Sequence, residues 1–238
     1  MNIYSEVCWV MPTKRESHSR LDFMTRDHHR VRDFVVLELP RKGIALTPAY
    51  IAETLNLAYV RVVEILDDLE KHMTFLFRNA EGAVTWAYPV TVEKTPHRVT
   101  FKSGEQIYAA WGVDAIATPF VQGQLRKEHL DLLIETECAC CGQQIHIQID
   151  SDLEYQVQEK DASPLIFVPI VDFDTLEDPS IVDAFWRNSV FFWSEEHAKE
   201  FSLKSNMVQG TLMTLEQTVS RTPISQGALF AFPREMPG

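Results

Sequence analysis

The chain has 238 residues, of which 45% are hydrophobic and 24% charged, a composition typical of globular proteins rather than disordered or fibrous ones. The formal net charge of −12 disfavours nucleic acid as a partner, because proteins that bind phosphate backbones usually neutralise them with Lys and Arg. The longest early apolar run, Val7 to Met11, is too short for a signal sequence or a membrane span. We therefore expect a cytoplasmic protein without a membrane partner.

The first part of the chain has the element order of a winged helix. We interpret the polar residues 1–27 as an N-terminal arm. Apolar residues with helical spacing then predict a helix from His28 that is stopped by Pro40 and Gly43. Two further helices and a hairpin are expected over residues 47–56, 59–73 and 74–88. Residues 28–90 are therefore predicted to form a winged-helix-like module.

A winged helix is often a DNA-binding module, but the charge of this one argues against that role. Between Thr47 and His72 the sequence has more acidic than basic residues: Glu53, Glu64, Asp67, Asp68 and Glu70 against Arg61 and Lys71. A recognition helix with an acidic face would be repelled by phosphate. A packing module docked on the next domain is the better interpretation, and nucleic acid is not expected as a partner.

Residues 91–222 are predicted to form a mixed β-sheet core flanked by helices, which makes the fold class α+β. Alternation is clearest over residues 144–150, where Ile145, Ile147 and Ile149 share one face of a strand. A preceding strand over 132–137 makes the cysteine-rich segment between them the turn of an antiparallel pair. A short apolar helix is expected over 109–117, broken before Pro119.

The remaining core elements are expected as short strands and helices, and residues 223–238 as a Pro-rich C-terminal tail. Strands are predicted over 155–159, 165–170 and 185–193, and helices over 179–184, 194–201 and 212–219. Ser194 is the predicted cap of the helix that follows it, with acidic residues in the first turn.

Three of the four cysteines, Cys138, Cys140 and Cys141, lie in the predicted turn between the strands over 132–137 and 144–150. Thiolates on a tight turn converge well on a thiophilic ion such as zinc, copper or mercury. A single turn supplies at most three ligands, and His146 or Cys8 are candidates to complete a site. The alternative is that one cysteine is buried in the core and the others are incidental turn residues.

Asp114 lies on an otherwise apolar predicted helix, where a carboxylate is costly to bury and tends to be paired or functional. A carboxylate stabilised by the helix dipole is the structural alternative. Arg187 and Asn188 interrupt an apolar strand and could bind a substrate carboxylate by charge-assisted hydrogen bonds. Arg187 could equally form a structural pair with Asp114.

Three segments together resemble the organomercurial (alkylmercury) lyases. They are Tyr108-Ala-Ala-Trp-Gly-Val-Asp114, the turn at Cys138, and Ala184-Phe-Trp-Arg-Asn-Ser-Val-Phe-Phe192 followed by Ser-Glu-Glu-His-Ala198. The helix and hairpin order before them also matches that family's N-terminal module. The resemblance covers roughly residues 30–200. It implies a fold in which two cysteines bind mercury and an aspartate helps to deliver a proton to the departing carbon.

The resemblance assigns the family aspartate to Asp114, but both family cysteines that bind mercury are absent. Trp111 and Trp186 occupy their positions, and indole cannot supply a thiolate. Cys138 matches a family cysteine usually regarded as structural, whereas Cys140 and Cys141 have no counterpart. The resemblance predicts that Trp111, Asp114, Trp186 and Arg187 line one cavity.

Three interpretations remain open. The chain could be a divergent lyase-fold enzyme that keeps Asp114 as proton donor and acts on another small organic or organometallic substrate. It could instead sequester or sense a thiophilic metal through Cys138, Cys140 and Cys141. It could also be a catalytically inactive scaffold or regulator. A small molecule or a metal ion is the expected ligand, with Trp111, Trp186 and Asn188 as binding residues.

Overall fold

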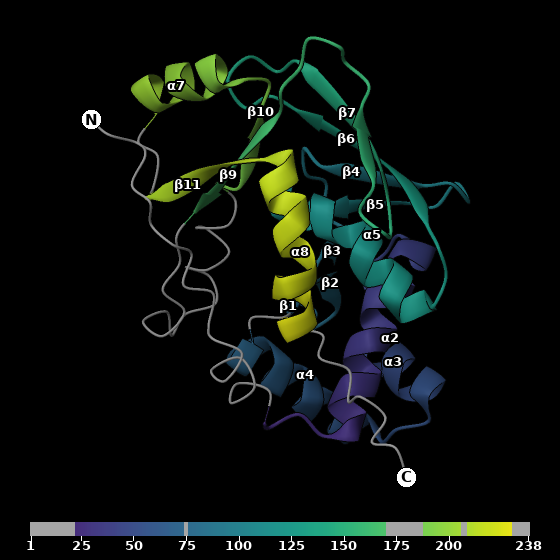
Figure 1. Ribbon diagram of the computed structural model, residues 1–238. Coiled ribbons are helices and arrows are strands. Elements are labelled where there is room, and N and C mark those ends of the chain that lie inside the picture. The colour runs from purple at the N-terminus through teal and green to yellow at the C-terminus, as the bar shows by residue number, and fades with distance from the viewer. Residues whose placement is uncertain (1–21, 74–75, 170–187, 206–208, 230–238) are drawn as a thin grey trace.

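The structure is a computed structural model in which residues 22–73, 76–169, 188–205 and 209–229 are described. These residues form an α+β fold, as the sequence predicted, with an eight-stranded sheet and a three-stranded sheet covered by helices (Figure 1). The described helices are α2 (Arg26–Lys42), α3 (Pro48–Leu55), α4 (Tyr59–Met73), α5 (Gly112–Arg126), α7 (Glu195–Lys204) and α8 (Leu215–Leu229).

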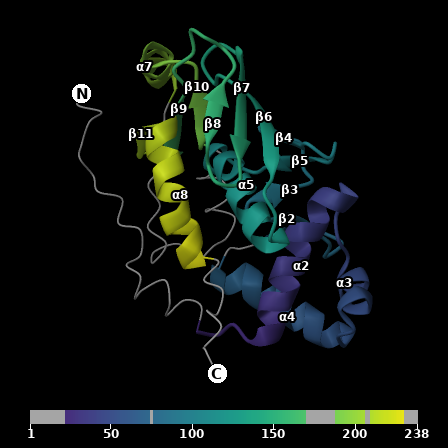
Figure 2. The same cartoon turned by 45° about the vertical axis from the view of Figure 1, so that its right-hand side comes forward.

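Helices α2, α3 and α4 lie together at one end of the molecule (Figures 1 and 2). α3 begins as its sequence predicted: Thr47 Oγ1 accepts a hydrogen bond from the Tyr50 N–H at 3.2 Å, and Pro48 takes the first helical position. The strands β1 (Leu76–Arg78) and β2 (Val84–Ala87) then form an antiparallel pair. β2 pairs with β3 (Val90–Thr91), and β3 pairs with β5. The hairpin that follows the N-terminal helices therefore belongs to the same sheet as the rest of the fold.

Helix α2 runs through Pro40, which was expected to stop it, and ends two residues later with Gly43 in the left-handed region at φ 63°. Proline has no N–H to donate to the carbonyl of Val36, four residues earlier. That carbonyl instead accepts a hydrogen bond from the side chain of Gln122 at 2.8 Å. The tertiary contact replaces the missing backbone bond, and the helix continues to Lys42.

The core sheet was predicted to be mixed, but every strand pairing in the large sheet is antiparallel, with the strand order β1-β2-β3-β5-β4-β6-β7-β8. Strands β6 and β7 pair along their whole length, and the isoleucines of β7 are buried while its polar residues face outward, as the alternation predicted. Its remaining strands are β4 (Arg98–Phe101), β5 (Gln106–Ala109), β6 (Asp131–Glu137), β7 (Gln144–Asp150) and β8 (Tyr155–Val157).

Helix α5 is the central helix of the fold and contacts both sheets as well as α2 and α8. The predicted helix over 109–117 was placed too early and ended too soon, because α5 begins at Gly112 and passes through Pro119 to Arg126. Most of its residues are buried. Packing on several elements at once holds a helix together across a proline that would break an isolated one.

The small sheet has the order β10-β9-β11 and is antiparallel. It consists of β9 (Leu165–Pro169), β10 (Val190–Phe192) and β11 (Gly210–Thr214). The last predicted helix began too early, because residues 212–214 belong to β11 and α8 starts at Leu215. α8 continues to Leu229, into the segment expected as a tail. The predicted helix over 179–184 lies outside the described residues.

None of the described helices combines the length and the apolar character that spanning a membrane requires.

Candidate functional site

Asp114 lies in the first turn of α5 and is completely buried. Among the described residues, neither of its carboxylate oxygens has a hydrogen-bond partner. Burial therefore raises the pKa of Asp114 well above its ordinary value, because the apolar surroundings disfavour the charged form. A carboxyl group in this environment favours its protonated form.

The start of α5 is tied to the residue that precedes β10. The N–H of Gly112 donates a hydrogen bond to the carbonyl oxygen of Ser189 at 2.9 Å, and the Val113 N–H lies 3.4 Å from Ser189 Oγ. A Cβ atom at Gly112 would lie 3.1 Å from that carbonyl and 3.3 Å from the ring of Phe191. Glycine therefore allows the close approach that places Asp114 beside this part of the chain.

Trp111 immediately precedes α5 and is buried in an aromatic cluster. Its ring centroid lies 5.0 Å from that of Trp86 and 6.4 Å from that of Tyr88. These separations are those of packed aromatic side chains. Trp111 lies three residues before Asp114 in the sequence. A large apolar side chain therefore fills the position that the resemblance assigned to a family cysteine.

The buried His97 also belongs to this region, although no sequence pattern singled it out. Its Nδ1 lies 2.7 Å from Thr136 Oγ1, and it forms a hydrogen bond with the backbone of Ser189. Burial lowers the pKa of His97 to about 4, so the ring is neutral at pH 7. Ser189 therefore joins the start of α5 to His97.

Of the other predicted substrate-binding residues, only Asn188 is among the residues that the structure describes. Trp186 and Arg187 lie outside the described residues, so the predicted cavity of Trp111, Asp114, Trp186 and Arg187 remains a prediction. Asn188 is described and its side chain is exposed.

The cysteine-rich segment is the turn between β6 and β7, as predicted. The Cys138 N–H donates to the Gln143 carbonyl at 2.8 Å, and the Gly142 N–H donates to the Cys138 carbonyl at 2.7 Å. Gly142 has a φ of 74°, which favours glycine. Cys138 is buried, Cys140 is half-buried and Cys141 is exposed.

The structure adds a histidine to this turn. Nδ1 of His197, in the first turn of α7, lies 3.5 Å from Cys138 Sγ and 3.6 Å from Cys141 Sγ. The three potential ligand atoms lie within 4.8 Å of one another. Cys140 is not part of this group, although the sequence interpretation included it with Cys138 and Cys141.

His146, a predicted additional ligand, is instead engaged by Glu159. Its Nδ1 lies 2.6 Å from Glu159 Oε1, and its backbone N–H donates to Glu159 Oε2 at 3.0 Å. Cys8, the other candidate, lies outside the described residues. The sequence had shown His197 only as part of the Ser194-Glu-Glu-His197 helix start, and nothing in that motif links it to the cysteine turn.

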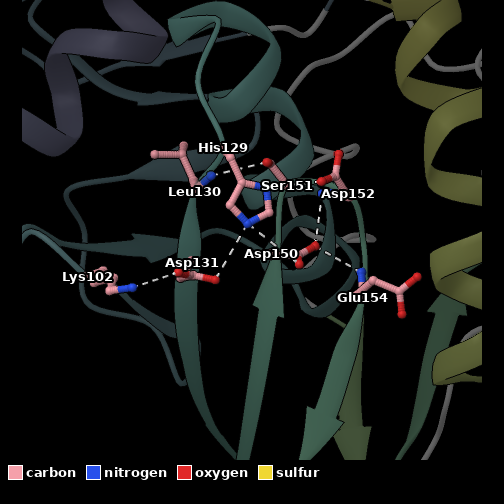
Figure 3. Close-up of polar contacts among 8 residues, drawn as sticks. All are labelled: Lys102, His129, Leu130, Asp131, Asp150, Ser151, Asp152 and Glu154. Atoms are coloured by element: carbon pink, nitrogen blue, oxygen red, sulfur yellow. Dashed lines mark hydrogen bonds and ion pairs between the residues drawn. The ribbon is translucent and has the colours of Figure 1, made fainter.

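A second group of possible ligands lies at the other end of β6 and β7, where Figure 3 shows His129 between Asp131 and Asp150. Nε2 of His129 is 3.8 Å from a carboxylate oxygen of each aspartate. Asp150 also accepts hydrogen bonds from the N–H groups of Asp152 and Glu154 at 2.9 and 3.0 Å. These bonds stabilise the turn between β7 and β8, and His129 is exposed while the two aspartates are half-buried, so we interpret the group as structural.

The comparisons with known proteins concern the same region. The family model for alkylmercury lyase matches residues 90–222, which are more than half of the chain and include Trp111, Asp114 and the cysteine turn. The solved structure of the mercury-bound form of MerB2 matches with a TM-score of 0.66 at 18% sequence identity, and the match covers 91% of this chain and 98% of that chain. No curated protein matches the chain.

Proposed function

Because the chain belongs to the alkylmercury lyase family, we propose that it is a divergent lyase-fold enzyme in which Asp114 donates a proton to a small organic or organometallic substrate. The observation that carries this proposal is the state of Asp114. Its carboxyl group is fully buried without a hydrogen-bond partner among the described residues, and burial raises its pKa well above the ordinary value, which favours the protonated acid. An acid that holds its proton at the working pH is suited to general-acid catalysis.

The same region argues against a standard organomercurial lyase. The resemblance to the family assigns its two mercury-binding cysteines to Trp111 and Trp186. Trp111 is packed against Trp86 and Tyr88 and offers no thiolate. The aromatic cluster would instead provide an apolar wall for a substrate, which is a common lining of small-molecule sites.

The proton transfer itself can be written from Asp114. The O–H bond of its carboxyl group breaks and a C–H bond forms, while the electron pair of the cleaved substrate bond stays on carbon. The atom released from carbon becomes electron-poor and needs a donor. Since Trp111 supplies none, a small thiol or water from solution would take this role. The remaining carboxylate is costly in its apolar surroundings and regains a proton from water.

Infrared difference spectroscopy tests the state of Asp114 directly. The wild-type protein minus Asp114→Asn should show a protonated carboxyl group at pH 7. Asp152→Asn, which alters an exposed aspartate, should give no such signal. A carboxylate signal from Asp114 at pH 7 would contradict the proposed proton donor.

Turnover of phenylmercury tests the second part of the proposal. With a small thiol present, we expect benzene release at the rate given by that thiol alone, in the wild type and in Asp114→Asn. Release well above this background that disappears in Asp114→Asn would show a standard organomercurial lyase. A protein that only stores or senses a thiophilic metal would need the cysteine turn but not Asp114.

A further inference from the structure

We propose that Cys138, Cys141 and His197 bind one zinc ion that fastens α7 to the turn between β6 and β7. The ion would join two segments that are far apart in sequence. The site does not involve Asp114, so it stands whether or not that residue is a proton donor.

The separations between the ligand atoms fit a tetrahedral zinc site. Zinc binds thiolate sulfur at about 2.3 Å and imidazole nitrogen at about 2.0–2.1 Å, which at a tetrahedral angle puts sulfur and nitrogen about 3.5 Å apart. The two observed distances from His197 Nδ1 are 3.5 Å to Cys138 Sγ and 3.6 Å to Cys141 Sγ. The side chains therefore need little rearrangement to hold the ion.

Cys141 Sγ also donates a hydrogen bond to Gln143 Oε1 at 3.3 Å, but hydrogen bonds to His197 do not require both sulfurs to lie close to its Nδ1. A ring nitrogen of a neutral histidine either donates one hydrogen or accepts with one lone pair. It can therefore form one good bond with one of the two thiols. An ion between the three atoms satisfies the nitrogen lone pair and both sulfurs together, because each is then a ligand.

The turn is built to hold two thiolates in a fixed position. Cys138 and Cys141 have the Cys-x-x-Cys spacing of zinc-binding turns, with Gly142 directly after them. The backbone hydrogen bonds of Cys138 with Gln143 and Gly142 close the turn. A further hydrogen bond, from the Ala139 N–H to the Phe191 carbonyl at 2.9 Å, attaches it to β10. Backbone hydrogen bonds therefore define the geometry of the turn that carries the two cysteines.

Among the described residues, helix α7 buries little apolar surface, and the side chain of Glu200 forms a further contact with Cys140 of the turn. Of its residues only Ala198 is buried, and Phe201 contacts Phe192 with ring centroids 5.4 Å apart. Figures 1 and 2 show α7 at the edge of the molecule beside β10. A helix with so little buried apolar surface gains a large share of its attachment from a metal bond.

The donor set favours zinc, and it leaves one coordination position for water or another ligand. Two thiolates and an imidazole suit zinc, whereas magnesium and calcium prefer oxygen. Cys140 lies in the same turn but outside the group of converging atoms. It therefore serves as a matched control, since the two neighbouring cysteines should differ in their effect on binding.

The binding test uses metal-free, reduced full-length protein and zinc titration with a competing chelator. We expect one zinc ion per chain in the wild type and at least about 100-fold weaker binding in Cys141→Ser and His197→Gln, since even residues that only support a ligand change metal affinity by roughly 10–100-fold. Cys140→Ser, His146→Gln and Asp114→Asn should bind zinc as the wild type does. Failure of the wild type to bind zinc, or an equal loss in Cys140→Ser and Cys141→Ser, would overturn the proposed ligand set.

Cobalt substitution tests the coordination geometry of the site, and amide hydrogen exchange tests whether the ion holds α7 in place. Cobalt in the site should show tetrahedral absorption bands with sulfur-to-metal charge transfer, and these should be lost in Cys141→Ser. Zinc should slow exchange of the amides of α7 in the wild type but not in His197→Gln, while the amides of α3 should not respond. If amide exchange in α7 does not depend on zinc, the ion does not hold α7 against the turn between β6 and β7.

Discussion

The side chain of Gln122 donates a hydrogen bond to the carbonyl oxygen of Val36 at 2.8 Å, which ties α5 to α2. That carbonyl lacks its usual helical partner because residue 40 is proline. Replacing Gln122 by Met, which has a similar shape, should leave a buried carbonyl without a partner. We expect a loss of about 1–3 kcal/mol in the free energy of unfolding, measured by urea denaturation.

A double-mutant cycle separates this bond from the general packing of Gln122. In Pro40→Ala the new backbone N–H can donate to Val36, so the Gln122→Met change should then cost less. Equal costs of Gln122→Met in the two backgrounds would show that the Val36 hydrogen bond contributes nothing measurable.

The N-terminal helices are predicted not to bind DNA, and the structure supplies a local reason. The basic side chain of Arg78 is engaged by acids of α4: its Nη2 lies 2.7 Å from Asp67 and its Nε donates to Glu70 at 2.9 Å. Arg61 of α4 similarly lies 3.1 Å from Glu64. Fluorescence anisotropy with a labelled duplex at low salt should show no binding. Binding that weakens steeply as salt is added would contradict the prediction.

The elements that the sequence predicted well are those with a strong local signal. Strand β7 alternates apolar and polar residues over its full length, and α3 has both an N-cap threonine and a following proline. The start of α8 also has a local signal in its sequence, Thr214 followed three residues later by Gln217. Thr214 and Gln217 form a reciprocal capping box, in which each side chain accepts a hydrogen bond from the backbone N–H of the other at 3.1 and 3.0 Å.

The candidate sites depended more on tertiary structure. Asp114 could be singled out because a carboxylate among apolar residues stands out in a sequence. His197 could not be connected with the cysteine turn, because 56 residues separate it from Cys141 and only the packing of α7 beside β10 brings them together. His97 gave no signal either, since its neutrality follows from burial among residues of other strands.

The raised pKa of Asp114 should make the protein less stable as the pH rises. The folded-state pKa lies above the unfolded value of about 3.9, so the native state binds more protons between these two values. The contribution of protonated Asp114 to the free energy of unfolding is fully present below the unfolded pKa. It is lost as the pH rises towards and through the folded pKa. Asp114→Asn does not titrate, so it should gain stability relative to the wild type as the pH rises above the unfolded pKa of about 3.9, measured by urea denaturation.

Asp152→Asn is the control for this measurement, because its side chain is exposed and should not change the pH dependence. A difference between wild type and Asp114→Asn that stays constant with pH would show that Asp114 is not titrating abnormally.

His97 should have the opposite effect at acidic pH. Its folded-state pKa of about 4 lies below the unfolded value of about 6.5, so between these values the unfolded state binds more protons. The contribution of the neutral ring is fully present above pH 6.5 and is lost as the pH falls to about 4, which amounts to a loss on the order of 3 kcal/mol. His97→Gln can still accept from Thr136 and donate to Ser189 but cannot gain a charge. Urea denaturation from pH 7 to pH 4.5 should therefore show a shallower loss of stability in His97→Gln than in the wild type, whatever the two proteins' absolute stabilities.

His129→Gln, a change at an exposed histidine, should keep the wild-type slope, and an unchanged slope in His97→Gln would show that protonation of His97 does not drive acid unfolding.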